Sequence, residues 1–351
     1  MTAVRSPGAR LLLLGPVAAL LAGAAAPAQE AVFDDVVEVI RLEIEVRVLD
    51  RRGEPIPGLG PADFEVTLDG VPVAVEAVDR PGEPPPPREP GATEPEETAA
   101  APALPRLVVL FFQRHALPSR ARGLMRMAHE ARALVRELGP GDLAAVVSFG
   151  PPLHVHTDFT GDRDLLLAAL DSVAPFRAVE LRDERPQPLT VRLPPRTAAG
   201  VRTVERSLEL LAHLLEPLPG AKSLLFFGWG LGELSGGAVR AGPDLRRARA
   251  VLARGKTAFF ALDVTQADHH TLEALLHELA HDTGGRFLRT FHQPAGTMAA
   301  ATAALAGHYR LTLVPPAGLG LEGELRLEVG LRGTPGEVLH PAKLTFVPAT
   351  R

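Results

Sequence analysis

The chain has 351 residues, with 37 basic and 42 acidic side chains, so its formal charge at pH 7 is −5. This balance provides no basic surface for nucleic acid, and nucleic-acid binding is not expected. The absence of cysteine excludes disulfides, cysteine-attached lipids and thiolate zinc sites.

The first 28 residues have the three-part layout of a secretory signal. Two arginines precede an apolar stretch over 11–26, and Ala26-Pro27-Ala28 forms a small-residue cleavage site. A retained membrane anchor is the alternative, but the stretch is shorter than the roughly 20 residues of a span and is interrupted by Gly15-Pro16. We expect cleavage after Ala28, a periplasmic or secreted mature chain without a membrane span, and a formal charge of −7, because the signal removes two arginines.

Residues 29–79 are interpreted as an N-terminal β module. Apolar and charged side chains alternate over 36–49, as in a half-buried strand. FEVTL, the Asp69-Gly70 turn signal and PVAVEAV then predict further antiparallel strands. Residues 80–105 are rich in Pro, Glu and Ala and cannot bury a core, so we expect an extended, solvated linker.

Over 106–307 short apolar runs alternate with amphipathic helical patterns. A buried strand at 107–112 is followed by a helix that we expect to begin with Ser119 as N-cap and to end at Gly139-Pro140-Gly141. Later strands are predicted at 143–149, 223–227 and 257–264, and later helices around 162–173, 201–216, 243–254, 269–282 and 295–306. This order predicts a doubly wound, mostly parallel α/β sheet covered on both faces, with binding at the carboxyl ends of its strands.

The tail, residues 308–351, returns to alternating strand patterns. A few isolated strands at each end of the chain would be marginal. We therefore expect the tail to pair with 36–79 in one small β module, with the α/β domain inserted between them.

The order of the α/β segments carries a family resemblance. LVVLFF, LGPGDLAAVVSFG, TDFTGDRDLLLAAL, LPGAKSLLFFGWG and LAHDTGGRF resemble the successive elements of a von Willebrand factor A-type domain. VRVLDRRGEPIPGLGPADFEVTLDGVPV is similar to the N-terminal module of exported bacterial proteins called VWFA-related. The resemblance covers most of residues 40–315 and implies a Rossmann-like domain used in protein–protein interaction.

The resemblance also implies a divalent-cation site, which this sequence does not preserve. The family takes ligands from an Asp-x-Ser-x-Ser loop after the first strand, a Thr in a second loop and an Asp after the fourth strand. The positions that align here are Gln113, His115, Leu117 and Trp229, with Thr203 as a weaker match for the Thr. Mg²⁺ and Ca²⁺ prefer carboxylate oxygens, and Arg114 adds a positive charge, so we expect no divalent metal and no cofactor.

Arg114, His115 and Trp229 are the candidate partner-binding residues. An aromatic side chain beside an arginine on a loop is typical of the anchors of protein interfaces. The alternative is that Trp229 fills the vacated site as part of the core, because tryptophan is usually largely buried.

His277, Glu278 and His281 match the HExxH pattern of zinc metalloproteases, in which two histidines on one helix face bind zinc. Phe287 occupies the third ligand position of the longer signature. The surrounding leucines already define a buried stripe, and Thr283-Gly284-Gly285 fits the end of the last helix of an A-type domain. We therefore expect a solvated polar face, with zinc proteolysis as an alternative.

The sequence favours an exported, non-enzymatic binding or scaffold protein with an unidentified protein partner. A zinc metalloprotease and a structural module of an envelope complex are the alternatives. We also expect His154, His156 and Asp158 to form an exposed strand face and Asp268 to be a helix N-cap.

Overall fold

The computed structural model describes residues 40–80, 105–173 and 188–346. The expected secretory signal over 1–28 and all but the ends of the expected linker over 80–105 lie outside these residues. Among the helices that are described, none combines the length and the apolar character that crossing a membrane requires.

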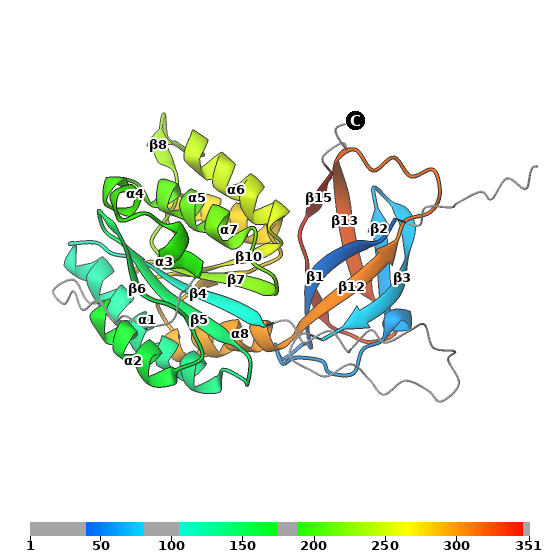
Figure 1. The fold of residues 1–351 in the computed structure, drawn as a ribbon, viewed down its shortest axis with the longest axis horizontal. Helices are drawn as coiled ribbons and strands as arrows, with labels where there is room; N and C mark the ends of the chain where they lie inside the picture. Colours follow the sequence, from blue (N-terminus) through cyan, green and yellow to red (C-terminus); the bar gives the residue numbers. More distant parts are fainter. Residues whose placement is uncertain (1–39, 81–104, 174–187, 347–351) are drawn as a thin grey trace, which may run out of the picture. The chain divides into compact units, whose positions relative to one another are not determined.

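The α/β part (Figure 1) contains the strands β4 (Arg106–Gln113), β5 (Leu143–Phe149), β6 (Leu153–Thr160), β7 (Ala221–Gly228), β10 (Thr257–Asp263) and β11 (Phe287–Arg289). Its longer helices are α1 (Pro118–Glu137), α2 (Arg163–Ser172), α5 (Val204–Leu215), α6 (Pro243–Arg254), α7 (Ala274–Asp282) and α8 (Pro294–Ala306). Shorter elements are α3 (Pro188–Arg192), α4 (Pro195–Gly200), the 3-10 turn η2 (Thr271–Glu273), and the hairpin β8 (Glu233–Ser235) and β9 (Ala238–Arg240).

Within the described residues these strands form one six-stranded sheet in the order β11-β10-β7-β4-β5-β6. All neighbours are parallel except β5 and β6, which are antiparallel. The chain runs outward from β4 through β5 and β6, then returns to β7 on the opposite side of β4. The strand order therefore reverses between β4 and β7, and the predicted doubly wound α/β fold is confirmed.

Helices cover both faces of this sheet (Figure 1). One core cluster joins the strands to buried side chains of α1, α2 and α8, and the other joins them to α3, α5, α6 and α7. β4, β7 and β10 are buried almost throughout, because each reads as a continuous apolar run rather than an alternating one. Phe112 and Phe227 stack across the β4–β7 pair with ring centroids 4.4 Å apart.

The β module contains strands from both ends of the chain. They are β1 (Leu42–Leu49), β2 (Phe64–Leu68), β3 (Val71–Asp79), β12 (His308–Val314), β13 (Gly323–Leu331), β14 (Glu337–Leu339) and β15 (Lys343–Phe346), with a 3-10 turn η1 (Pro61–Asp63) before β2. Their order in the sheet is β14-β1-β12-β3-β2-β13-β15. β12 thus lies between β1 and β3 and pairs antiparallel with both, as expected for strands that are marginal alone.

The half-buried pattern expected for β1 is wrong on its polar face. Glu45 and Arg47 are 7% and 2% exposed, because β12 side chains contact Glu45 and residues of the α/β part contact Arg47. Arg47 Nη2 donates to Ser223 Oγ over 2.9 Å. Glu45 lies 2.5 Å from His308 Nε2 and accepts from Arg310 Nε over 3.0 Å. Burial opposes ionisation of Glu45, but His308 and Arg310 outweigh it and lower its pKa to about 2.

Two expected helix caps are also wrong. α1 begins at Pro118, and its N-cap residue Leu117 makes no side-chain hydrogen bond. Proline suits the first helical position because it has no N–H group that would need an acceptor there. Ser119 therefore lies inside the first turn. Asp268 does not cap a helix either, since its carboxylate binds His292 Nε2 at 2.6 Å and the following turn begins only at Thr271.

Candidate functional site

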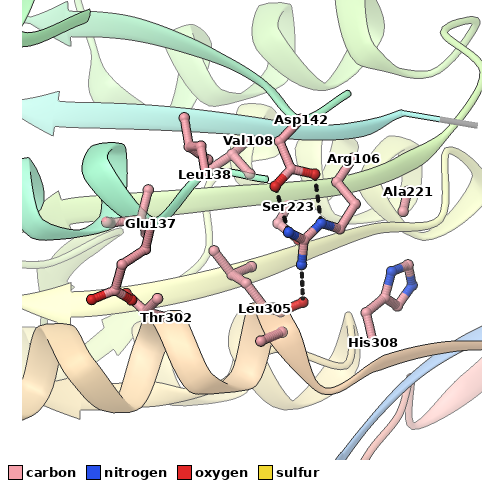
Figure 2. Close-up of a pocket in the computed structure, with 12 residues that line it drawn as sticks. Arg106, Val108, Glu137, Leu138, Asp142, Ala221, Ser223, Thr302, Leu305 and His308 are labelled. Atoms are coloured by element: carbon pink, nitrogen blue, oxygen red, sulfur yellow. Dashed lines mark hydrogen bonds and ion pairs between the residues drawn. The ribbon is translucent and has the colours of Figure 1, made fainter. Parts of the chain in front are cut away.

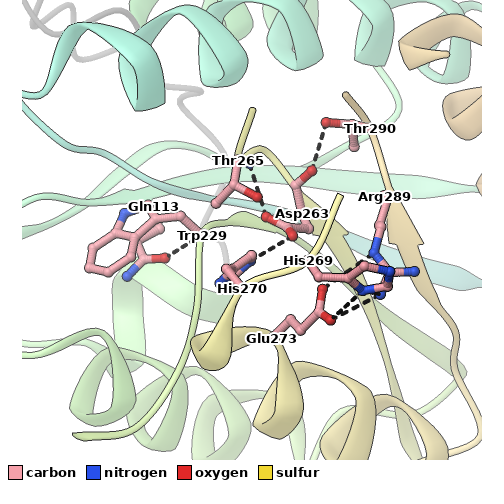
Figure 3. Close-up of polar contacts among 9 residues, drawn as sticks. All are labelled: Gln113, Trp229, Asp263, Thr265, His269, His270, Glu273, Arg289 and Thr290. Atoms are coloured by element: carbon pink, nitrogen blue, oxygen red, sulfur yellow. Dashed lines mark hydrogen bonds and ion pairs between the residues drawn. The ribbon is translucent and has the colours of Figure 1, made fainter. Parts of the chain in front are cut away.

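The carboxyl ends of β4, β7 and β10 lie side by side, at Gln113, Gly228 and Asp263. We call the loops that follow these three strands the carboxyl edge (Figure 3). Because the strand order reverses between β4 and β7, this edge is where an open α/β sheet leaves a crevice for a ligand.

Gln113 joins the first two loops of the edge. Its side chain is buried, and Oε1 accepts a hydrogen bond from Trp229 N over 3.0 Å. Figure 3 shows the amide directed at the start of the β7 loop. Gln113 thus fixes the position of Trp229, a role that needs an amide or carboxylate but no metal ion.

Trp229 lies between the core and two polar side chains. It is partly buried and packs against the core cluster on the α1 face of the sheet. The guanidinium of Arg120 lies 3.7 Å from the centre of the indole ring, and the His115 ring meets it edge-on at 5.2 Å. The indole Nε1 is buried and has no hydrogen-bond partner within the described residues. Trp229 is therefore part core and part surface, between the two alternatives that the sequence left open.

The β4 loop and the first turn of α1 carry two arginines, Arg114 and Arg120. Arg114, on the β5 side of the β4 loop, donates from Nη2 to Gly150 O over 3.3 Å, while its buried Nε has no partner in the described part of the chain. Burial lowers the pKa of Arg114 and of Arg120. Burial and the neighbouring Arg120 charge lower the pKa of His115. We call Arg114, His115, Arg120 and Trp229 the arginine–tryptophan patch.

The structure brings together only some of the residues aligned with the family's cation ligands. Gln113, His115 and Trp229 lie at the carboxyl edge, where Gln113 and His115 each contact Trp229. Leu117 is exposed and precedes α1, and its backbone N donates to His115 Nδ1 over 3.0 Å. Thr203 caps α5, where its hydroxyl accepts from Arg206 N over 3.2 Å. None of these side chains is a carboxylate.

A second polar cluster lies at the end of β10 and was missed by the sequence analysis. The Asp263 carboxylate is 1% exposed, accepts from Thr265 N over 2.9 Å, and is bound by His270 Nε2 at 2.8 Å. Glu273 lies nearby, with one donor atom of each of Asp263, His270 and Glu273 within 4.8 Å of the others. We call these three residues the β10 triad (Figure 3).

The surroundings of Glu273 complete this cluster. Arg289 donates to both of its oxygens, over 3.0 and 3.3 Å, and His269 Nδ1 lies 3.2 Å from Oε1. Burial opposes ionisation of Glu273, but Arg289 and His269 lower its pKa. The sequence carried one signal of the triad: an aspartate at the carboxyl end of a buried strand, followed within seven residues by two histidines.

The HELAH residues are engaged elsewhere. The His277 ring stacks on Phe287 with centroids 3.7 Å apart, and Glu278 accepts from Arg249 Nη1 over 2.6 Å. The His281 side chain is 78% exposed. Within the described residues these three do not form a group that could hold a metal ion, whereas the β10 triad does.

The expected exposed face of β6 is wrong, because His156 and Asp158 are buried. α2 and α3 both contact β6 and cover its two sides. His156 lies between two hydroxyls, with Ser148 Oγ 2.7 Å from Nε2 and Ser172 Oγ 2.6 Å from Nδ1. Burial, assisted by the charges of Arg114 and His154, lowers the pKa of His156 to about 4.

A small cavity of about 100 Å³ lies at the opposite end of the sheet, where β4 and β7 begin (Figure 2). Its polar lining is dominated by Arg106, which binds the Asp142 carboxylate and donates from Nη1 to Leu305 O over 3.1 Å. These groups satisfy each other and tie the start of β4 to the end of α8. The cavity is therefore best explained as a structural feature, away from the carboxyl edge.

No protein-family model matches the chain, and a search of curated proteins finds no match. Among solved structures, an aerotolerance-related membrane protein from Bacteroides fragilis is 14% identical over 57% of this chain and 98% of its own, with a TM-score of 0.37. A von Willebrand factor type A protein from Catenulispora acidiphila is 12% identical over 88% of this chain and 74% of its own, with a TM-score of 0.42. Proximal thread matrix protein 1 from the mussel byssus is 13% identical over 59% of this chain and 46% of its own, with a TM-score of 0.41. The resemblance to an A-type domain accordingly rests on the strand order and the helical layers of this chain.

Proposed function

We propose that this chain is an exported, non-enzymatic binding or scaffold protein that holds a protein partner at the carboxyl edge, through the arginine–tryptophan patch. The partner group would be a carboxylate side chain. No metal ion is needed at the β4 loop for this contact, because guanidinium groups take over the role of the cation.

The observation that carries this proposal is the position of Arg120. Its guanidinium covers the Trp229 ring at 3.7 Å, and within the described residues no acidic side chain pairs with it or with Arg114. Other arginines in the described part of the chain form ion pairs with nearby acids, as Arg106 does with Asp142. A partly buried cation on an aromatic ring, with a second arginine on the adjoining β4 loop, favours a carboxylate partner, since charge-assisted bonds to arginine are the strong ones.

The experiment identifies the partner as a protein that is retained on immobilised samples of this chain. Wild type, Arg120→Ala and Trp229→Ala are incubated with envelope extract, and retained proteins are identified by mass spectrometry. Arg122→Ala is the matched control, because Arg122 is exposed on the same helix and outside the patch. We expect a protein retained by wild type and Arg122→Ala to be lost with the other two variants, and to be released by salt.

Retention that is equal in all four proteins would contradict this proposal and favour docking through the β module. Export is tested separately by the mass of the mature chain. A new N-terminus at Gln29 is expected after secretion with the native leader. A full-length mass, with Met1 retained in the membrane fraction, would contradict cleavage.

A further inference from the structure

We propose that the β10 triad, Asp263, His270 and Glu273, is a binding site for Zn²⁺ or a divalent metal of similar chemistry. This site is distinct from the β4-loop positions at which the sequence predicted that no metal binds. It revises the broader expectation that the chain binds no divalent metal at all.

The donor set favours zinc over Mg²⁺ or Ca²⁺. One imidazole and two carboxylates supply one nitrogen and two oxygen donors, already within 4.8 Å of one another. Zn²⁺ is bound by His nitrogen and Asp or Glu oxygen, whereas Mg²⁺ and Ca²⁺ take oxygen ligands. Three protein donors leave a coordination position open to water or to a ligand group from outside.

The burial of Asp263 supplies an independent reason for a cation here. A carboxylate that is 1% exposed is costly unless a positive charge or several hydrogen bonds compensate it. Within the described residues Asp263 has no lysine or arginine partner; only Thr265 N and His270 contact its oxygens. The hydroxyl of Thr265, whose backbone N donates to this carboxylate, is buried without a hydrogen-bond partner in the described part of the chain. The site thus holds more acceptor capacity than the protein itself satisfies.

Arg289 is compatible with a bound ion. A carboxylate has two oxygens with about four lone-pair positions, so Glu273 can keep a contact with Arg289 while another lone pair faces the metal. The Arg289 side chain is 37% exposed and can shift outward, and its charge reduces the repulsion between the two carboxylates. The His270 and Glu273 side chains are 19% and 14% exposed, which leaves an approach from solvent.

The test is a titration of the full-length chain after it has been stripped of metal with a chelator. Zn²⁺ binding is measured by calorimetry, and Co²⁺ is added as a spectroscopic probe. We expect about one equivalent of each metal to bind, with affinity lowered by roughly ten-fold or more in His270→Ala and in Glu273→Gln. The double variant His277→Ala, His281→Ala is the matched control, since it removes two histidines from the neighbouring helix, and its affinity should equal that of wild type.

Three outcomes would overturn the inference: no binding to wild type, unchanged affinity in His270→Ala, or loss of binding in the control variant. Loss of binding in the control variant would indicate that the metal binds to His277 and His281 on α7 instead. Both test residues are partly exposed, and circular dichroism establishes that each variant is folded. If one variant is unfolded, the other decides the question. The measurement needs no partner, so its result is independent of the proposed protein interaction.

Discussion

Acidification from pH 8 to pH 5 should destabilise this protein through His156. The imidazole is enclosed by Ser148 and Ser172, which are both almost fully buried. Ser172 Oγ also donates to Ala169 O over 2.7 Å, so its single proton is used and it must accept from His156 Nδ1. Nε2 then accepts from Ser148 in the neutral ring, and a second ring proton would lose this bond.

The magnitude follows from the two pKa values. The pKa of His156 is about 4 in the folded chain and about 6.5 in the unfolded chain. Between these values the unfolded chain binds more protons than the folded one, so stability rises with pH. The contribution of His156 is complete above pH 6.5. At pH 5 about 2 kcal/mol of it is lost, and at pH 4 about 3 kcal/mol.

The assay compares urea unfolding of wild type and His156→Gln at pH 8 and pH 5. Glutamine retains hydrogen-bonding capacity but does not titrate. All other titrating groups are common to both proteins, so the difference between the two pH dependences isolates His156. We expect wild type to lose about 2 kcal/mol more than the variant between these pH values.

Equal pH dependences in the two proteins would refute this reasoning. If His156→Gln does not fold, the protonation of the His156 ring can still be measured directly by NMR in wild type. Its signals should remain those of a neutral imidazole at pH 5. Protonation near pH 6.5 would show that the enclosed site does not exclude the charge.

Two further predictions concern packing and buried charge. In Gly123→Ala the new Cβ would lie 2.1 Å from Val264 O, so we expect a loss of about 2 kcal/mol in urea unfolding. Gly200→Ala, with nothing within 4 Å, should change the free energy by less than about 0.5 kcal/mol. Glu45→Gln should cost about 3 kcal/mol or more, because it leaves Arg310 without its ion-pair partner and the buried Arg47 without a nearby negative charge. The exposed Glu43→Gln should be nearly neutral by the same measurement, and equal effects at the two glutamates would contradict the assignment.

The sequence by itself determined the fold class and most element positions, because these follow from local patterns. Continuous apolar runs such as LLFF and FFAL belong to strands covered on both faces, and the intervening helices carry their own apolar stripes. That Gln113 and Trp229 carry no carboxylate is equally a property of the sequence. Strands at opposite ends of the chain were expected to pair because neither group is stable alone.

Only the tertiary structure decided which polar side chains are buried and which meet. Alternation along β1 and β6 predicted solvated faces, but packing from other elements buried Glu45 and His156. Likewise, nothing in the sequence distinguishes Arg120 from other arginines in the helices. Only the fold shows that its guanidinium lies over the Trp229 ring. Asp263, His270 and Glu273 come together through a turn whose path no local pattern specified. Such contacts depend on long-range packing, which residue spacing along the chain does not encode.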